Sequence, residues 1–483
     1  MKISILFSLV LIILLTLPAA AQTGTGPSLA GNWFGTLDAG GTKLRLLLKV
    51  EKTTGGYAAK LDSIDQDAKD LPLDSVALNG NKVTFAAAAL GLTYDGSVNE
   101  KYDEIVGTFN QGSASMPLIL TRMDAANTTA APKIVTRPQD PVKPYPYDEE
   151  EVNYRNAIDN VKLAGTLTLP RDKSKSYPAV VLITGSGAQD RNETVYGHRP
   201  FLVLADYLTR NGIAVLRVDD RGVGGSDIGS PSATSENFAL DVLAGVEYLK
   251  TRKEVNGKQI GLVGHSEGGV IAPIAATRSK DVAFIVMLAG LGQLGEDVIY
   301  TQTELIQRAS GADPATIASQ REMFKNIHAI VKKETDKKLI EEQVNAAIAK
   351  HVAAMNEAQR KSFAPIEATI KSVSPMFTTP WYRYLITYNP IPILKKVKVP
   401  VLALNGELDL QVAYKQNLGP IESALKAGGN KDVTVRSVPK LNHLFQTATT
   451  GVPTEYATIE ETMSPEVLKA VSDWILAHSV GRK

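Results

Sequence analysis

The 483-residue chain contains no cysteine, so disulfide bonds and cysteine chemistry are both excluded. Its charges nearly cancel, with 52 Lys and Arg against 51 Asp and Glu, which gives no electrostatic case for nucleic-acid binding. The sequence also lacks a basic stripe suited to an anionic membrane surface. Histidine is scarce, at six residues, so candidates for a catalytic base can be compared one by one. The remaining composition is that of an ordinary globular protein, long enough for two or three domains.

The N-terminus predicts a secretory signal peptide over residues 1–21. Lys2 precedes an apolar run from Ile3 to Leu17, and the small-residue site Ala19-Ala20-Ala21 follows. The run is short for a membrane span, and the absence of cysteine excludes lipid attachment after the site. We therefore expect cleavage after Ala21, no stable membrane anchor thereafter, and a periplasmic or secreted protein whose cores alone stabilise it.

Residues 22–123 predict a small antiparallel β domain. Short alternating apolar runs, such as 44–50 and 117–120, are separated by Gly-Gly and Asn-Gly turns. We expect about eight strands in a barrel or a sandwich, with a structural or positioning role because no catalytic constellation is visible. Residues 124–147, rich in Ala, Thr and Pro, predict an extended and fairly stiff linker.

Residues 148–483 predict an α/β domain. Two antiparallel strands near 150–156 and 162–169 come first, and strands then alternate with helices, which implies a mostly parallel sheet flanked by helices. The alternation breaks over about 292–390, where the chain is helical and charged, and then resumes. An insertion at this place predicts a helical cap over an active site.

The run Gly264-His265-Ser266-Glu267-Gly268 directly follows an apolar strand at 259–263. It has the form G-x-S-x-G between a strand and a helix, which is the nucleophile elbow of an α/β-hydrolase fold. The two glycines let the backbones pack closely around the serine, and the N–H of Glu267 then points the same way as the serine hydroxyl. We predict that Ser266 is a nucleophile and that the Glu267 N–H is one donor of an oxyanion hole.

A serine nucleophile needs a histidine base and an orienting acid, which follow it in that order on this fold. Of the six histidines, only His443 lies in a loop after the final strand, so we predict that it is the base; His265 is expected to point elsewhere. Two carboxylates, Glu407 and Asp409, follow the strand at 399–404. Asp409 is favoured because it lies deeper in the turn, where capping the next helix is its alternative role.

The second oxyanion donor is expected in the loop Thr184-Gly185-Ser186-Gly187-Ala188-Gln189-Asp190-Arg191. The Ser186 N–H is favoured and that of Gly187 is the alternative. Neither a third glycine nor a G-K-[ST] sequence follows, which argues against a phosphate-binding turn. Asp219 and Asp220 precede the serine and are expected instead to anchor their loop through Arg221.

The end of the helical insert is rich in aromatic residues. Their side chains are expected either to line an acyl or alcohol pocket or to pack the core of the cap. The candidate substrate-binding residues are Phe377, Trp381, Tyr382 and Tyr384.

Three motifs in this order, 184–191, Asp220-Arg221-Gly222-Val223-Gly224-Gly225-Ser226 and the elbow, resemble those of a known family. Together they are similar to bacterial α/β-hydrolase carboxylesterases that are distantly related to prolyl-oligopeptidase-like peptidases, over roughly residues 150–480. The resemblance implies a Ser-Asp-His esterase that hydrolyses short to medium acyl esters of small molecules and is often exported. It implies that Ser266 is the nucleophile, Asp409 the orienting acid and His443 the base. This mechanism requires no metal or organic cofactor.

Several alternatives stay open at this point. They are a serine peptidase or aminoacyl hydrolase of the prolyl-oligopeptidase-like group, an acyltransferase, and a non-enzymatic ligand-binding module on the same fold. The repeats of a β-propeller, which some of these peptidases carry, are not visible before the linker. A homo-oligomer is also left open, and the sequence does not specify acyl length or the alcohol.

Overall fold

The computed structural model describes residues 28–39, 42–64, 68–111, 114–123 and 137–479. The predicted signal peptide, 1–21, and the first part of the predicted linker, 124–136, lie outside the described residues. Within the described ranges, no helix has the length and apolar character needed to cross a membrane.

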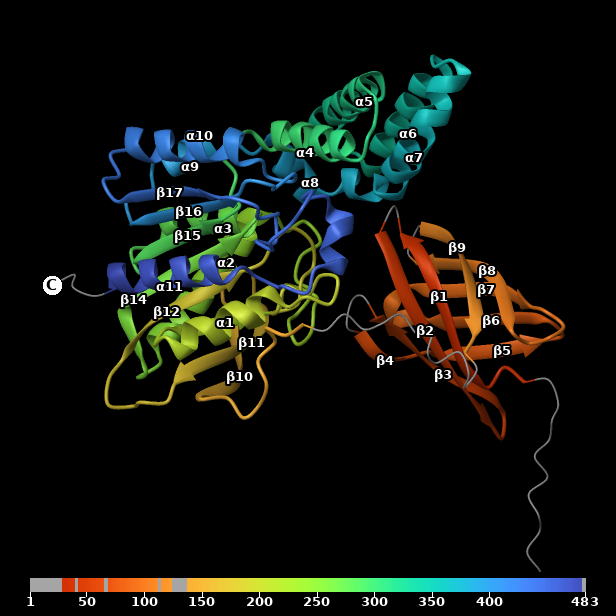
Figure 1. Cartoon of the computed structure of the whole chain (residues 1–483), viewed down its shortest axis with the longest axis horizontal. Coiled ribbons are helices and arrows are strands. Elements are labelled where there is room, and N and C mark those ends of the chain that lie inside the picture. Colours follow the sequence, from red (N-terminus) through yellow and green to blue (C-terminus); the bar gives the residue numbers. More distant parts are fainter. Residues whose placement is uncertain (1–27, 40–41, 65–67, 112–113, 124–136, 480–483) are drawn as a thin grey trace, which may run out of the picture.

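The N-terminal domain is a single antiparallel sheet of nine strands in the order β4-β3-β2-β1-β9-β8-β7-β6-β5 (Figure 1). The Leu73 N–H donates to the Ala59 carbonyl at 3.2 Å and so extends the pairing of β3 with β4. The chain then enters β5, which contacts β3, so the two ends of the sheet approach each other. The sheet thus resembles a partly closed barrel rather than a sandwich. It has one strand more than the sequence predicted. The strands are β1 (Gly31–Ala39), β2 (Thr42–Thr53), β3 (Gly56–Ser63), β4 (Ala68–Pro72), β5 (Ser75–Asn79), β6 (Lys82–Ala87), β7 (Leu92–Val98), β8 (Glu104–Gln111) and β9 (Ala114–Arg122).

The curled sheet encloses a hydrophobic core of its own. Trp33 is fully buried, and the rings of Phe85 and Tyr94 stack with centroids 4.6 Å apart. The Tyr94 hydroxyl donates to the Leu118 carbonyl at 3.0 Å, so this buried polar group is satisfied. Because the domain buries a separate core, its stability does not depend on the second domain for its apolar contacts.

The second domain contains an eight-stranded sheet in the order β10-β11-β13-β12-β14-β15-β16-β17. The pairs β10–β11 and β11–β13 are antiparallel, and the five remaining neighbouring pairs are parallel. Strands β12, β13, β15 and β16 and the second half of β14 are almost entirely buried, as expected for strands covered by helices on both faces. The strands are β10 (Tyr147–Asn156), β11 (Val161–Pro170), β12 (Tyr177–Ile183), β13 (Ala214–Val218), β14 (Val255–His265), β15 (Phe284–Leu288), β16 (Val401–Gly406) and β17 (Val433–Val438).

Two groups of helices cover this sheet (Figure 1). One group consists of α1 (Pro200–Arg210) and α11 (Pro465–Ser479), which contact each other. The other consists of α2 (Ser235–Lys250), α3 (Gly268–Arg278), α9 (Pro390–Leu394) and α10 (Tyr414–Ala427). This is the layered α/β-hydrolase architecture expected from the sequence.

The second half of the predicted linker lies against the α/β domain. Arg137 Nη1 donates to the Ile459 carbonyl at 2.6 Å. The Gln139 side chain accepts from the Thr462 N–H at 2.6 Å and donates to the Met463 carbonyl at 2.7 Å. The segment from residue 137 onward is therefore held by the α/β domain rather than standing free as a spacer.

The helical insert lies between β15 and β16 and covers one end of the sheet (Figure 1). It has its own apolar core, in which His328 is fully buried between the hydroxyls of Tyr300 and Tyr382, each 2.9 Å away. Burial lowers the pKa of His328 to about 4, so the imidazole is neutral at pH 7. The insert contains α4 (Gly295–Ala309), α5 (Pro314–Lys333), α6 (Lys337–Ala353), α7 (Glu357–Ser372), η4 (Ser374–Thr378) and α8 (Pro380–Thr387).

Candidate active site

Ser266 lies between the end of β14 and the start of α3, with a backbone φ of +53°. This left-handed conformation is rare for a residue other than glycine and marks backbone strain. The Ser266 N–H donates to the Leu288 carbonyl at 2.8 Å, and its carbonyl accepts from the Gly269 N–H at 2.9 Å. The sharp turn predicted for the elbow is thus held by backbone hydrogen bonds on both sides of the serine.

The two glycines of the motif are required by close backbone contacts. A Cβ on Gly264 would lie 2.0 Å from the Gly268 carbonyl oxygen. A Cβ on Gly268 would lie 2.1 Å from the Ile183 carbonyl oxygen, on the neighbouring strand. Neither contact can be relieved by moving a side chain, which gives the G-x-S-x-G spacing its physical cause.

The structure brings Asp409 and His443 together. His443 Nδ1 lies 2.9 Å from Asp409 Oδ2, and both side chains are buried. Asp409 Oδ1 accepts from the backbone N–H groups of Gln411 and Val412 at 2.8 Å each. The alternative role as a helix cap is not realised, because α10 begins only at Tyr414. The carboxylate is instead oriented by its own turn.

The other candidate acid, Glu407, is used elsewhere. It accepts a hydrogen bond from the Ser437 hydroxyl at 2.8 Å. Of the two carboxylates left open by the sequence, only Asp409 contacts His443 in the described part of the chain.

Ser266 and His443 line the same cavity, which has a volume of about 520 Å³. Among the hydrogen bonds of the described residues, none joins the Ser266 hydroxyl to His443. Such bonds are often long in unliganded sites and tighten when substrate binds. The side chain of Asn442 holds the loop around the base by accepting from the N–H groups of Leu444 and Gln446 at 3.0 Å each.

His265 does not point away from the site, as the sequence suggested. Its ring lies 4.7 Å from the ring of His443 and lines the same cavity. Nδ1 lies 2.9 Å from Glu193 Oε1, and Nε2 lies 2.9 Å from the His443 carbonyl oxygen. Although burial opposes protonation, the Glu193 carboxylate holds the pKa of His265 above its ordinary value. His265 therefore links the base loop to Glu193, a contact that sequence spacing gave no signal to find.

The loop after β12 lies beside the serine. Ser186 and Gly185 line the serine's cavity, and the Gly185 N–H is already used, because it donates to Glu193 Oε1 at 2.7 Å. Gly187 lies on a neighbouring cavity instead, with a φ of +101°. Ser186 is therefore the better placed of the two predicted donors on this loop, together with Glu267, which also lines the serine's cavity.

The expectation that Asp219 and Asp220 anchor their loop through Arg221 is wrong. Asp219 pairs with Arg191, with Nη2 to Oδ2 at 2.7 Å, whereas Arg221 pairs with Asp241, with Nε to Oδ2 at 2.6 Å. An arginine twenty-eight residues upstream leaves no local sequence signal, so the neighbouring Arg221 looked like the natural partner.

Asp220 faces the loop that carries Ser186. It accepts hydrogen bonds from the Thr184 hydroxyl at 2.8 Å and from the Gln189 N–H at 2.9 Å. These two contacts hold both ends of the segment that contains Ser186. Burial raises the pKa of Asp220 to about 8, and the nearby Glu193 and Glu267 carboxylates act in the same direction.

The four aromatic candidates divide between the site and the cap. Phe377, Trp381 and Tyr382 line the serine's cavity, and Phe377 and Tyr382 also belong to the cap core. Tyr384 does not line this cavity in the described structure; its hydroxyl donates to Glu236 Oε1 at 2.6 Å, where α8 meets α2. It therefore attaches the cap to the domain below, and its assignment to substrate binding is corrected.

The described residues contain no group of three or more His, Asp or Glu side chains arranged to hold a metal ion.

A protein-family model described as serine aminopeptidase, S33, matches residues 199–447, just over half of the chain. The match includes the elbow, Asp409 and His443. The chain belongs to this S33 family. The resemblance to α/β-hydrolase esterases and their peptidase relatives, inferred from the three motifs, is thereby confirmed.

Among characterised relatives of this S33-family chain is Esterase EstD of Thermotoga maritima, which is 27% identical over 307 residues. The alignment covers 63% of this chain and 62% of EstD, so the chain spans less than two thirds of that relative's length. Among solved structures, an esterase of Pyrococcus furiosus is 18% identical, with 72% of this chain and 99% of that chain covered and a TM-score of 0.43. The acylaminoacyl peptidase of Pyrococcus horikoshii is 13% identical, with 90% and 61% covered and a TM-score of 0.41.

Proposed function

We propose that the protein is a serine carboxylesterase that hydrolyses short to medium acyl esters through an acyl-enzyme. One observation carries the proposal: the strained Ser266 elbow opens into the same cavity as His443, whose ring is oriented by a buried Asp409. The name of the relative EstD points in the same direction. Nucleophile, base and acid in one cavity are the parts that acyl transfer to water requires.

In the proposed mechanism, the Ser266 hydroxyl attacks the ester carbonyl while His443 Nε2 accepts its proton. The backbone N–H groups of Glu267 and Ser186 donate to the oxyanion. His443 then gives the proton to the leaving alcohol and activates a water molecule for deacylation. Asp409 keeps the proton on Nδ1 and stabilises the imidazolium that forms.

The acidic side chains of the cavity favour an ester over an aminopeptidase substrate. An aminoacyl substrate carries an ammonium group, which needs a carboxylate partner. In the described lining, the two acidic residues are Glu193, which accepts from Gly185 and His265, and Glu267, which accepts from Ser235 and Trp381. Because each carboxylate is already held by two protein donors through its Oε1 atom, we expect aminoacyl amides to be poorer substrates than esters.

The apolar lining of the cavity also supports an uncharged acyl group. Beside the aromatic side chains, Leu291, Val298 and Ile299 contribute to it. We propose in addition that the protein is exported and acts in the periplasm or outside the cell after cleavage behind Ala21. Acyl transfer to an acceptor other than water would use the same acyl-enzyme and differs only in the molecule that enters the cavity.

The test is hydrolysis of p-nitrophenyl esters from acetate to laurate by the protein and by Ser266→Ala. We expect activity on the short to medium esters and a loss of roughly 10⁴-fold or more in kcat for the variant, with the fold unchanged by circular dichroism. Aminoacyl p-nitroanilides are assayed in parallel. Faster cleavage of the anilides than of the esters, or equal rates for the two proteins, would contradict an esterase.

A further inference from the structure

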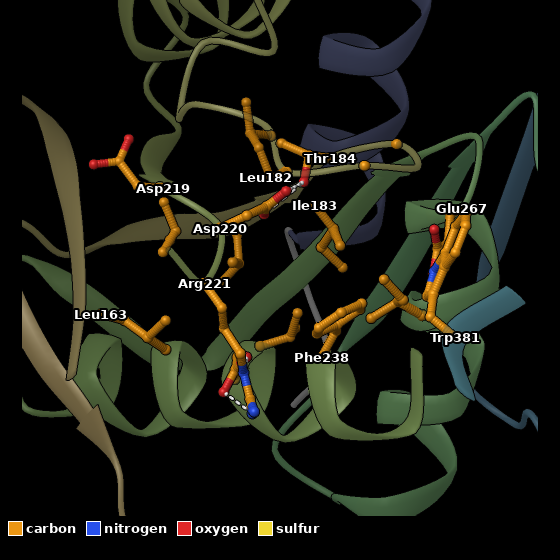
Figure 2. Close-up of a pocket in the computed structure, with 18 of the residues that line it drawn as sticks. Leu163, Leu182, Ile183, Thr184, Asp219, Asp220, Arg221, Phe238, Glu267 and Trp381 are labelled. Carbon is orange, nitrogen blue, oxygen red and sulfur yellow. Dashed lines mark hydrogen bonds and ion pairs between the residues drawn. The ribbon is translucent and has the colours of Figure 1, made fainter. Parts of the chain in front are cut away.

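A second cavity, of about 190 Å³, lies behind the oxyanion loop, between the ends of β12 and β13 and helix α2 (Figure 2). Apolar side chains form much of its wall: Leu163, Ile183, Val218, Phe238, Val242 and Ile271. Among the charged side chains on the wall, Arg221 pairs with Asp241 and Asp219 pairs with Arg191, although Arg221 Nη1 is buried without a hydrogen-bond partner. Asp220 accepts from Thr184 and Gln189. The apolar side chains make the cavity suitable for a hydrocarbon group.

The second cavity and the serine's cavity share one wall. Gly185, Glu267 and Trp381 line both of them, and Figure 2 shows Glu267 and Trp381 side by side at one end of the second cavity. Trp381 Nε1 donates to Glu267 Oε1 at 2.9 Å, and the Ser235 hydroxyl donates to the same oxygen at 2.6 Å. The indole is thus held as a partition between the two spaces by a buried carboxylate.

We propose that the second cavity is a subsite for the hydrocarbon tail of an acyl group, and that Trp381 sets the acyl length by closing it off from Ser266. The proposal rests on the esterase function proposed above. The Glu267 N–H holds the substrate's carbonyl oxygen in that mechanism, and its side chain holds the partition, so an acyl chain bound at Ser266 extends next to the indole. With the partition in place, the chain is confined to the serine's cavity.

Trp381 is a suitable element to determine specificity, because it belongs to the cap and not to the sheet. It lies in the first turn of α8 and is partly exposed. Tyr384 attaches the same helix to Glu236 independently of Trp381. Replacing the indole by a small side chain should therefore join the two cavities and leave α8 in place.

The experiment measures kcat/KM on p-nitrophenyl acetate, hexanoate and decanoate for the protein and for Trp381→Ala. We expect the ratio of decanoate to acetate to rise by about tenfold or more in the variant, because each added methylene that finds an apolar site contributes to kcat/KM. Trp381→Phe keeps most of the ring volume and loses the N–H, so its ratio should stay much closer to that of the parent.

A second pair of variants separates the two cavities. Val242 lines only the second cavity, from α2. In the Trp381→Ala background, Val242→Phe fills that space, and we expect it to reverse the gain on decanoate. Leu240→Phe adds a ring two residues earlier on the same helix, where it lines neither cavity, and should keep the gain. Thermal unfolding of each variant shows whether it is folded.

The outcomes distinguish failure of the proposed subsite from failure of the proposed esterase function. Acetate hydrolysis with an unchanged chain-length ratio in Trp381→Ala, or a gain that Val242→Phe does not reverse, would overturn the subsite and leave the esterase intact. Failure of the parent protein to hydrolyse any of the esters would overturn the esterase itself. Trp381→Leu, which also removes the N–H and most of the volume, repeats the test if Trp381→Ala does not fold.

Discussion

The elbow and the cap meet at the same cavity but are built in different ways. Around Ser266 the critical contacts are between backbones: the positions of Gly264 and Gly268 leave no space even for a Cβ. In the cap the contacts are between side chains, such as His328 with two tyrosine hydroxyls, and Trp381 with Glu267. Backbone contacts admit few residue types and so leave a readable motif, whereas side-chain contacts can be made by many combinations.

Asp409→Asn should have the largest effect on kcat, because Asp409 is held by backbone N–H groups and orients His443. An amide keeps the geometry of the carboxylate but favours the wrong tautomer of His443 and no longer stabilises the imidazolium. We expect kcat on p-nitrophenyl acetate to fall by about 10⁴-fold. Glu407→Gln, two residues away, is the matched control and should change kcat by less than about threefold. A similar loss in both variants would contradict the assignment of the acid.

Gly264→Ala tests the backbone contacts without touching a reacting group. The new methyl meets the Gly268 carbonyl at 2.0 Å, so we expect a loss of about 3 kcal/mol or more in the free energy of unfolding. Chemical denaturation measures it. At Gly419 in α10 nothing lies within 4 Å of an added Cβ, so Gly419→Ala should change stability by less than about 1 kcal/mol. Equal losses in the free energy of unfolding for the two variants would contradict the claim that backbone contacts at the elbow exclude a Cβ.

Asp220 predicts a pH dependence for the loop that carries Ser186. Its pKa rises to about 8 in the folded protein, from about 4 in the unfolded chain, so between these values the folded state binds more protons. Stability should therefore fall as the pH rises from about 4 through about 8. Asp220→Asn keeps an acceptor and removes the titration, so its free energy of unfolding should gain on the order of 4 kcal/mol relative to the parent as the pH rises from 5 to 8.5. Thermal unfolding of both proteins at both pH values measures this difference. The same change in stability with pH in the parent and in the variant would contradict the prediction.

Tyr384→Phe addresses the cap and should have the smallest effect. It removes the hydrogen bond to Glu236 and keeps the ring, which costs about 1 kcal/mol. Because Trp381 still contacts Glu267, kcat/KM on acetate should change by less than about threefold. A large loss of activity with unchanged stability would instead return Tyr384 to the substrate site. Stopped-flow hydrolysis and thermal unfolding together decide between the two.

The same difference between backbone and side-chain contacts explains which features could be predicted from the sequence. The strand-to-helix turn at Ser266 was predictable because glycine is required there, and chain order then led to Asp409 and His443. The number of strands in the N-terminal sheet was predicted only approximately, because short strands such as β4, Ala68–Pro72, have no alternating apolar pattern. The partner of Asp219 was misjudged, and Tyr384 was assigned to the substrate pocket, because Arg191 and Glu236 are distant in sequence and no periodicity links them to these residues.

His265 has a consequence for the chemistry of its neighbour. Two imidazoles, those of His265 and His443, line the cavity of Ser266. Both ring nitrogens of His265 face oxygen atoms, those of Glu193 and of the His443 backbone, at 2.9 Å each. The backbone oxygen can only accept, so Nε2 is the donor there, and the Glu193 carboxylate occupies Nδ1. In the proposed mechanism, these contacts leave His443 rather than His265 to accept the proton of Ser266. The different roles proposed for these two histidines therefore follow from their different hydrogen-bond partners.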